Sequence, residues 1–326
     1  MSLVRIDDLS IDYRRAGKTI RAVNELTFSV EEGSIVGLVG ESGSGKSTLA
    51  LSLMGLLPRN GSVTGGSILF EGREMQGLSE DDWRTVRGHD MGMVFQGAMN
   101  SLNPVKRVRD QVAETVRTHE PELGKDGSID RSHELLNLVG IPSDRHEAYP
   151  HEWSGGMRQR GGIALALSGR PNFLIADEPV TALDVIVQAR ILRLLEDLQE
   201  ALGLTILFIT HDLGVVARLC DRVVVMYAAQ AVEEGTVEEI FQSPKHPYTK
   251  ALLGSVPNFA KGRGKSHGIS GSPPSLINPP QGCRFHPRCP DAMDICTRED
   301  PYQTTFSSSQ RAMCHLYDRQ EADDAE

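Results

Sequence analysis

The residues best suited to chemistry form a glycine-rich loop. Residues 40–48 read GESGSGKST, which fits the pattern GxxxxGK[ST] between an expected strand and an expected helix. Glycines at this spacing let backbone N–H groups surround phosphates, and the helix N-terminus adds positive partial charge. Lys46 can reach the β- and γ-phosphates, and the Ser47 hydroxyl can ligate Mg²⁺. The predicted nucleotide-binding residues of this loop are Gly40, Ser42, Gly43, Ser44, Gly45, Lys46, Ser47 and Thr48.

Two adjacent carboxylates follow an apolar run at residues 173–176. Asp177, at the end of the expected strand, can hold the water shell of Mg²⁺. Glu178 can polarise a water molecule for in-line attack on the γ-phosphate. A carboxylate pair after a strand is, on its own, more often part of a solvated loop. Its position downstream of a phosphate-binding loop favours the catalytic interpretation.

A second helix start that could bind an anion lies at residues 154–160, SGGMRQR. Ser154 is a suitable N-cap, and Gly155 and Gly156 expose the N–H groups of the first turn. Alone, this pattern is more typical of an ordinary flexible helix start. Gly161 and Gly162 lie inside the same expected helix, where each costs about 1 kcal/mol relative to Ala. We therefore expect this helix to be soft.

The elements that must position these residues alternate along the chain. Helices alternate with apolar runs, which predicts parallel βαβ units in an α/β fold. Polar, helical sequence between residues 105 and 152 predicts a helical subdomain inserted into that core. The expected strands are 34–39, 92–95, 172–176 and 204–210, with a strand pair at 223–232, and the expected helices are 46–57, 185–202 (closed by Gly203) and 212–220.

Composition excludes several functional classes. The 326 residues suggest about two domains. Lys and Arg number 34 against 44 Asp and Glu, and the net charge of −10 argues against a general basic surface for nucleic acid. No apolar run approaches the roughly 18 residues of a membrane helix, and the N-terminus lacks an apolar signal core. We expect a cytosolic chain that reaches a membrane only through a partner.

Four cysteines cluster near the C-terminus, after a Gly-, Pro- and Ser-rich segment at residues 257–282 that predicts a linker or extended arm. In a cytosolic chain such a cluster favours metal binding over disulfides. Four thiolates could hold a 4Fe-4S cluster or Zn²⁺, although the spacing is not that of a zinc ribbon, and four unligated thiols are the alternative. Cys220 is expected in the core, and His286 and His315 in solvent. The candidate ligands are Cys283, Cys289, Cys296 and Cys314.

Taken in order, these motifs resemble the ATP-binding cassette of ABC transporters over residues 3–235. Residues 40–48 match the Walker A motif, 154–157 the signature motif, 174–178 the Walker B motif and 182–184 the D-loop. Three further site residues follow from the resemblance. Gln96 matches the Q-loop residue that senses Mg²⁺ and the membrane partner, His211 the switch histidine that contacts the γ-phosphate and the attacking water, and Tyr13 the aromatic that stacks on adenine.

The resemblance also implies an architecture and a mechanism. The fold would be a P-loop ATP-binding cassette with a RecA-like core, a helical subdomain (about 97–165), an antiparallel β subdomain and a C-terminal cysteine-rich extension. The domain boundaries would be 1–256 for the cassette, 257–282 for the linker and 283–326 for the extension. Two cassettes would pair head to tail, so that Ser154, Gly155 and Gly156 of one cap the ATP of the other. Glu178 would be the catalytic base, with Ser47, Gln96 and Asp177 around Mg²⁺.

Three segments resemble the oligopeptide, dipeptide and nickel importer branch of this family. They are SGGMRQR at 154–160, QGAMNSLNPV at 96–105 and SPKHPYT at 243–249, followed by Leu252 and Leu253. The resemblance implies an ATPase that energises peptide uptake at the cytoplasmic face of the membrane, with a 4Fe-4S cluster on the C-terminal cysteines. Its partners would be a second, different cassette subunit, two transmembrane permeases and an extracytoplasmic solute-binding protein.

The chain departs from the family pattern at two places, and its motifs leave some alternative functions open. The signature reads WSGGM rather than LSGGQ, and Ala229 stands where a hairpin glycine is common, but no catalytic group is missing. An importer of nickel or another small solute fits the same motifs. A non-transport ABC ATPase acting on ribosomes or DNA usually has two cassettes or a long coiled-coil insert, and neither is visible. A nucleotide-binding module without turnover is disfavoured by Glu178 and His211. The motifs do not identify the solute.

Overall fold

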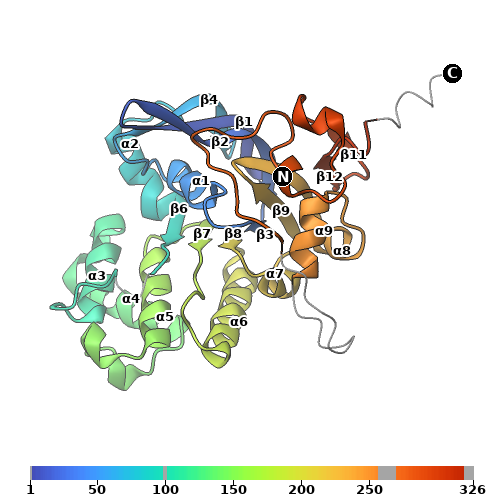
Figure 1. Cartoon of the computed structure of the whole chain (residues 1–326). Coiled ribbons are helices and arrows are strands. Elements are labelled where there is room, and N and C mark those ends of the chain that lie inside the picture. Colours follow the sequence, from blue (N-terminus) through green and yellow to red (C-terminus); the bar gives the residue numbers. More distant parts are fainter. Residues whose placement is uncertain (1, 98–100, 256–268, 319–326) are drawn as a thin grey trace. The chain divides into compact units, whose positions relative to one another are not determined.

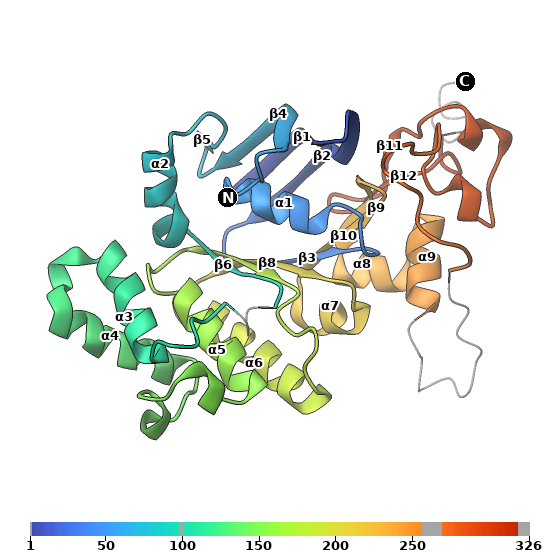
Figure 2. The same ribbon diagram turned by 60° about the vertical axis from the view of Figure 1, so that its left-hand side comes forward.

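The computed structural model describes residues 2–97, 101–255 and 269–318, which belong to two compact units (Figures 1 and 2). The helical unit consists of Val30–Ile35 and Gln76–Ile209, and the sheet unit of Ser2–Ser29, Val36–Met75 and Thr210–Glu326. Parts of three predicted segments lie outside the described residues: 98–100 after Gln96, 256–268 before and within the predicted linker, and 319–326 at the C-terminus.

Parallel strands form the centre of the helical unit. The strand β6 (Met91–Val94) pairs with β7 (Phe173–Asp177), and β7 pairs with β8 (Thr205–Thr210). All their residues are buried, which explains why these sequences are apolar runs rather than alternating patterns. The carboxyl ends of such strands are where parallel α/β sheets bind ligands. Asp177, the last residue of β7, lies at this edge, within the strand rather than after it.

The helix α6 (Val185–Leu202) has the bounds predicted from sequence. Its N-terminus is capped by Asp184, whose side chain accepts hydrogen bonds from the N–H groups of Ile186 (3.1 Å) and Val187 (2.9 Å). Its C-terminus is followed by Gly203 at a φ of +66°, the left-handed conformation that favours glycine. Local signals at both ends therefore determine this helix.

Helices α3, α4 and α5 pack against one another in the helical unit, as the predicted helical subdomain requires (Figure 1). The remaining elements of this unit are α2 (Glu80–Thr85), the turn η1 (Val86–Asp90), α3 (Val108–His119), the turn η3 (Pro121–Leu123), α4 (Gly124–Leu138), the turns η4 (Ser143–Arg145) and η5 (Pro150–Glu152), and α5 (Gly155–Ala166). None of the helices in the described parts of the chain is long and apolar enough to cross a bilayer.

An antiparallel sheet forms one part of the sheet unit, in the order β2-β1-β4-β5. It corresponds to the antiparallel β subdomain that the cassette resemblance implies. The helix α1 (Lys46–Leu53) lies beside it in both views (Figures 1 and 2). Its predicted continuation to residue 57 is wrong, because Gly55 takes a φ of +61° and ends the helix. The strands are β1 (Ser2–Arg15), β2 (Lys18–Glu31), β4 (Gly61–Phe70) and β5 (Arg73–Glu74).

The C-terminal extension adds strands to the other part of the sheet unit. There β3 (Ile35–Val39) runs parallel to β9 (Arg222–Tyr227), which pairs antiparallel with β10 (Gln230–Thr236). The extension's β12 (Arg311–Met313) then pairs with β10, and β11 (Gln303–Thr305) with β12. The other elements are α7 (Leu213–Leu219), α8 (Val237–Gln242), α9 (Pro247–Gly254) and the short turns η7 (His286–Arg288) and η8 (Asp294–Thr297).

Candidate functional site

The glycine-rich loop of the sheet unit is shaped by close backbone packing. Gly45 has a φ of +108°, and a Cβ there would lie 2.3 Å from the carbonyl oxygen of Ala22 in β2. A Cβ on Gly40 would lie 2.1 Å from the carbonyl oxygen of Met226 in β9. Both distances are too short for any side chain, so these positions require glycine. Because Gly45 also offers no capping side chain to α1, the helix begins with its amides directed at the loop.

Lys46 is buried behind this loop. Its Nζ donates hydrogen bonds to the carbonyl oxygens of Gly40 (2.8 Å) and Glu41 (2.9 Å) and to Ser44 Oγ (3.3 Å). An ammonium group held among neutral oxygens can exchange them for the charged oxygens of a phosphate, which bind it more strongly. Ser47 is exposed on the first turn of α1.

The aromatic residue predicted for the base is placed near the same helix. The Tyr13 hydroxyl donates to Thr48 Oγ1 at 3.4 Å, so the ring lies beside α1. His211 directly follows β8 and is exposed, and the next residue, Asp212, caps α7. The sheet unit therefore contains the Walker A residues, Tyr13 and His211.

The helical unit contains the predicted base together with the Q-loop residue. Gln96 Nε2 donates to Glu178 Oε2 at 3.0 Å, and Thr181 Oγ1 donates to the same oxygen at 2.9 Å. The Glu178 N–H donates to the carbonyl oxygen of Ile209 at 2.9 Å. Its φ of +48° is uncommon for a residue with a side chain, and such conformations are held by their surroundings. The structure thus brings together Gln96 and Glu178, 82 residues apart in sequence.

Two features of this carboxylate site differ from the sequence analysis or add to it. Asp177 is only 4% exposed at the edge of the parallel strands, and a carboxylate oxygen there is a suitable ligand for a hard cation such as Mg²⁺. Thr181 was missed by the sequence analysis, because a threonine three residues after a glutamate is not a recognisable signal. Its hydroxyl fixes the Glu178 oxygen that also binds Gln96.

The signature segment begins α5 as predicted. Ser154 Oγ accepts a hydrogen bond from the Met157 N–H at 3.3 Å. A Cβ on Gly156 would lie 2.6 Å from Val187 Cγ1, so this turn packs closely on α6. A Cβ on Gly161 would lie 2.7 Å from the Trp153 ring. Gly161 therefore makes room for a buried tryptophan, which gives a packing reason for a glycine that we interpreted only as softening the helix.

The four cysteines of the extension gather in the sheet unit. The Cys283 N–H donates to the carbonyl oxygen of Cys296 at 3.0 Å. Burial raises the pKa of the Cys314 thiol to about 12, and negative charge on Cys283, Cys289 and Cys296 raises it further. Among the described residues, however, no group of three or more His, Cys, Asp and Glu side chains is arranged to hold a single metal ion.

The remaining cysteine and the two histidines are structural. Cys220 is buried, as predicted, and burial raises the pKa of its thiol. The expectation that His315 is solvated is wrong: it is buried, its Nε2 donates to the carbonyl oxygen of Glu299 at 2.8 Å, and its Nδ1 is bonded to the Asp318 carboxylate. His286 is half-buried and bonded through Nδ1 to the carbonyl oxygen of Cys283.

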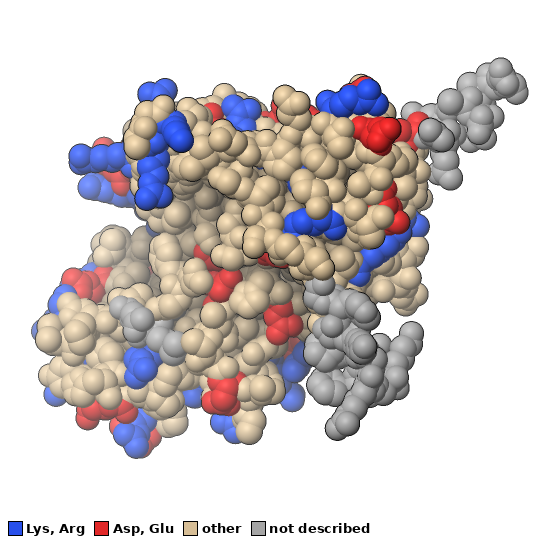
Figure 3. Space-filling view, in the orientation of Figure 1, with Lys and Arg blue, Asp and Glu red and all other residues tan. Residues whose placement is uncertain are grey.

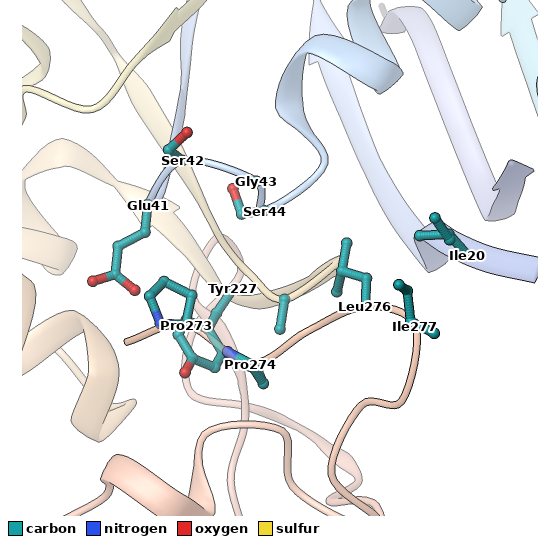
Figure 4. A pocket seen from close by; sticks show the side chains of 11 residues that line it. Ile20, Glu41, Ser42, Gly43, Ser44, Tyr227, Pro273, Pro274, Leu276 and Ile277 are labelled. Carbon is teal, nitrogen blue, oxygen red and sulfur yellow. The ribbon is translucent and has the colours of Figure 1, made fainter. Parts of the chain in front are cut away.

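A cavity of about 460 Å³ lies beside the glycine-rich loop within the sheet unit (Figure 4). Its lining includes residues 41–44 and Tyr227, together with Pro273, Pro274 and Ile277. The last three belong to the segment predicted as a linker, whose described part, residues 269–282, has no helix or strand. On the face shown in Figure 3, Lys and Arg side chains are interspersed with Asp and Glu in small groups.

Comparisons with known proteins identify the family of this chain. Residues 23–181 match the family described as ABC transporter, and residues 232–296 match the C-terminal region of the oligopeptide/dipeptide transporter family. The chain is 44% identical to the dipeptide transport ATP-binding protein DppD of Bacillus subtilis, covering 97% of this chain and 95% of that protein. It is 45% identical to the oligopeptide transport ATP-binding protein OppD of Salmonella typhimurium, covering 96% and 93%.

Solved structures agree with the fold. The ATP-binding cassette MJ0796, in a dimeric post-hydrolysis state bound to ADP and Pi, has a TM-score of 0.65 and 26% identity, covering 72% of this chain and 98% of that one. The cbiO1 protein of Clostridium perfringens, part of an ABC transporter complex, has a TM-score of 0.64 and 29% identity, covering 74% and 91%. Both likenesses support the predicted cassette fold.

Proposed function

Since the chain belongs to the ATP-binding subunits of ABC transporters, we propose that it energises the uptake of di- or oligopeptides through partner membrane permeases. It is an ABC-type ATPase with a cassette fold. Support for peptides as the solute comes from relatives that align along nearly the whole chain and are named for dipeptide or oligopeptide transport. The match over residues 232–296, outside the core motifs, supports the same assignment.

The sheet unit would bind the nucleotide. Lys46 would exchange its carbonyl partners for the β- and γ-phosphate oxygens, and the amides at the start of α1 would bind the same phosphates. Tyr13 would stack on the adenine. Gly40, Ser42, Gly43, Ser44 and Gly45 would surround the phosphates through their backbone, and Thr48 would contact them from α1. His211 would contact the γ-phosphate and the attacking water.

The observation that carries the catalytic assignment is the hydrogen-bonded group of Gln96, Glu178 and Thr181. Two donors bind one carboxylate oxygen of Glu178, so the other oxygen has a defined direction from which to accept a proton from water. Ser47, Gln96 and Asp177 offer hydroxyl, amide and carboxylate oxygens, the donor types that Mg²⁺ prefers. When bound, Mg²⁺ neutralises charge on the β- and γ-phosphate oxygens.

The signature turn explains why the chain would work in pairs. Ser154, Gly155 and Gly156 begin a second helix with exposed amides, suited to the ATP of a partner cassette. The cassette resemblance implies this head-to-tail pairing, and we propose that the partner is a different ATPase subunit. Affinity purification with the membrane subunits tests the point: two copies of this chain, with no second cassette, would contradict it.

The cysteines of the extension would hold one 4Fe-4S cluster. Support comes from the family resemblance and from the hydrogen bond of the Cys283 N–H to the Cys296 carbonyl oxygen, which joins two of the four cysteine segments. Among the described residues no group of three or more His, Cys, Asp and Glu side chains is arranged to hold a single ion, and Zn²⁺ is the alternative that metal and sulfide analysis distinguishes from the cluster. The cluster would supply structural order to a segment with little core. The ligands would be Cys283, Cys289, Cys296 and Cys314.

The proposed organisation follows from these roles. Residues 1–256 would form the cassette, 257–282 a linker and 283–326 the extension. The subunit would act at the cytoplasmic face of the membrane, bound to two permeases that receive peptides from an extracytoplasmic binding protein.

Reconstitution into vesicles tests the transport proposal. The chain would be combined with the permeases and second cassette from the same gene cluster, with ATP enclosed on the cassette side. The solute-binding protein and radiolabelled dipeptide, pentapeptide or Ni²⁺ would be added on the other side. ATP-dependent accumulation of a peptide is expected. Accumulation of Ni²⁺ alone would assign the other solute of this branch, and ATP hydrolysis without accumulation of any solute would contradict import.

A further inference from the structure

The extension is joined to the phosphate-binding loop by an ion pair. Arg288 donates two hydrogen bonds to the Glu41 carboxylate, from Nη1 to Oε2 at 2.6 Å and from Nη2 to Oε1 at 3.0 Å. The Arg288 side chain is only 6% exposed, and that of Glu41 is 25% exposed. Two-point contacts between a guanidinium and a carboxylate fix geometry as well as charge. In Figure 4 the Glu41 side chain leaves the loop on the side where Pro273 and Tyr227 lie.

Aromatic packing holds both partners of this ion pair. The backbone N–H of Glu41 donates to the Tyr248 hydroxyl at 3.0 Å. Tyr248 is fully buried, and its ring centroid lies 4.6 Å from that of Tyr227 and 5.4 Å from that of Phe285. Phe285 belongs to the extension, and the guanidinium of Arg288 lies 5.8 Å from the Tyr227 ring. Glu41 is therefore held at both its backbone and its side chain.

Glu41 in turn positions Lys46. Its carbonyl oxygen accepts hydrogen bonds from Lys46 Nζ at 2.9 Å and from the Ser44 N–H at 3.2 Å. A rotation of Glu41 would move one of the three oxygens that accept hydrogen bonds from the Lys46 ammonium. It would also break the hydrogen bond from the Ser44 N–H that closes the turn of the loop. Contacts therefore run without interruption from the extension to the lysine of the phosphate site, all inside the sheet unit.

We propose that Arg288 is a positioning residue for the phosphate-binding loop, so that nucleotide affinity depends on the folding of the cysteine-bearing extension. Arg288 ends the turn η7, directly before Cys289, whose N–H donates to the carbonyl oxygen of His286 at 3.3 Å. Order in the cysteine segment thus sets the place of the guanidinium. The inference concerns ATP binding alone and does not depend on which solute the transporter carries.

Equilibrium binding of ATP to the purified full-length chain tests this proposal. For Arg288→Met, which keeps an unbranched apolar stem, we expect the Kd for ATP to rise about tenfold, a typical strength of coupling between sites. We expect kcat at saturating ATP to change less than about twofold, because Glu178, the proposed base, lies in the other unit. The matched control is Arg298→Met, a change at an exposed arginine of the same extension, which should leave the Kd unchanged.

A double-mutant cycle separates this role from a general loss of structure. Glu41→Gln should weaken ATP binding in the same direction, and the double variant should bind no more weakly than the weaker single variant. If Arg288→Met fails to fold, Glu41→Gln still decides the question from the loop side. A Kd within twofold of the parent in Glu41→Gln, or losses that simply add in the double variant, would overturn the proposal.

Discussion

The two units support their parts of the ATP site in different ways. In the sheet unit, the loop residue Glu41 is held by Arg288 and Tyr248, which are 247 and 207 residues away in sequence. In the helical unit, Glu178 is held by Thr181, Gln96 and Ile209, all within one continuous stretch, Gln76–Ile209. We infer from this difference that nucleotide affinity depends on the C-terminal extension, whereas the proposed base is positioned within its own unit.

The largest effect is expected from removing the proposed base, which tests whether turnover and ATP binding depend on different units. Glu178→Gln keeps the shape of the side chain but cannot accept a proton from water, so we expect kcat to fall about 10²- to 10⁴-fold. The Kd for ATP should stay near the parent value, because the loop that binds the phosphates belongs to the other unit. Steady-state hydrolysis and equilibrium ATP binding measure the two quantities. Glu200→Gln, at an exposed position on α6, is the control. Turnover at the parent rate in Glu178→Gln would disprove the assignment.

The opposite effect is expected from the sheet unit. Lys46→Met retains the apolar stem but removes the ammonium, which makes three hydrogen bonds in the loop. Hydrogen bonds to charged groups contribute about 1.5–3 kcal/mol, so we expect the Kd for ATP to rise about 10- to 100-fold. The measurement is calorimetric titration with ATP. An unchanged Kd together with lost turnover would show that binding and chemistry are not divided between the units in this way.

Local sequence patterns predicted the bounds of elements and the positions of motifs in each unit. The bounds of α6 follow from Asp184 and Gly203, and the loop at residues 40–48 from its own spacing, because these signals act between neighbours in sequence. The nucleotide and turnover motifs are local patterns of the same kind, and the roles that they predict for individual residues stay predictions. The residues that form each motif could therefore be predicted from the sequence.

Contacts between distant segments could not be predicted in this way. The pairing of Arg288 with Glu41 and the packing of Gly161 against Trp153 depend on how the chain returns on itself, which no local signal encodes. The hairpin lies within the predicted strand pair, but both of its alanines, Ala228 and Ala229, adopt positive φ, where glycine is favoured. There the Ala229 N–H donates to the carbonyl oxygen of Ser44, so tertiary contact with the loop overrides the local preference.

Glycine substitutions distinguish packing in the two units. In an open helical position Gly→Ala stabilises by up to about 1 kcal/mol. In Gly161→Ala the new methyl group would lie 2.7 Å from the buried Trp153 ring, so we expect a loss of about 1–3 kcal/mol in the free energy of unfolding. Urea unfolding followed by tryptophan fluorescence reports this change, because both tryptophans, Trp83 and Trp153, lie in the helical unit.

The control for that substitution lies in the sheet unit. Gly254 ends α9 and has open space where a Cβ would be placed, so Gly254→Ala should not destabilise the protein. It should also leave the tryptophan transition unchanged. Equal destabilisation by both substitutions would mean that the contact with Trp153 does not explain Gly161.

The smallest expected effect is a change in the stability of the sheet unit with pH, caused by one buried histidine. Burial lowers the pKa of His246 to about 3, and the nearby Lys250 lowers it further. Its Nδ1 accepts a hydrogen bond from the Tyr248 N–H at 3.0 Å, so the neutral ring caps α9. Below its ordinary pKa of about 6.5, the unfolded chain takes up a proton that the folded chain does not. Stability therefore falls as the pH drops through 6.5, by about 0.8 kcal/mol between pH 7.5 and 6.

His246→Asn isolates this contribution, because the amide oxygen can still accept the Tyr248 N–H but does not titrate. Hydrogen exchange of the α9 amides, measured at pH 7.5 and 6, gives the opening free energy of this part of the sheet unit. The parent should lose about 0.8 kcal/mol more than the variant over that interval. Glu233 has a pKa raised by burial, and its carboxylate accepts a hydrogen bond from the backbone N–H of residue 246. Its contribution to the pH dependence is therefore common to both proteins. Equal pH dependence in the two proteins would show that His246 gains its proton equally in the folded and unfolded chain, and that the aromatic packing around the loop does not exclude charge.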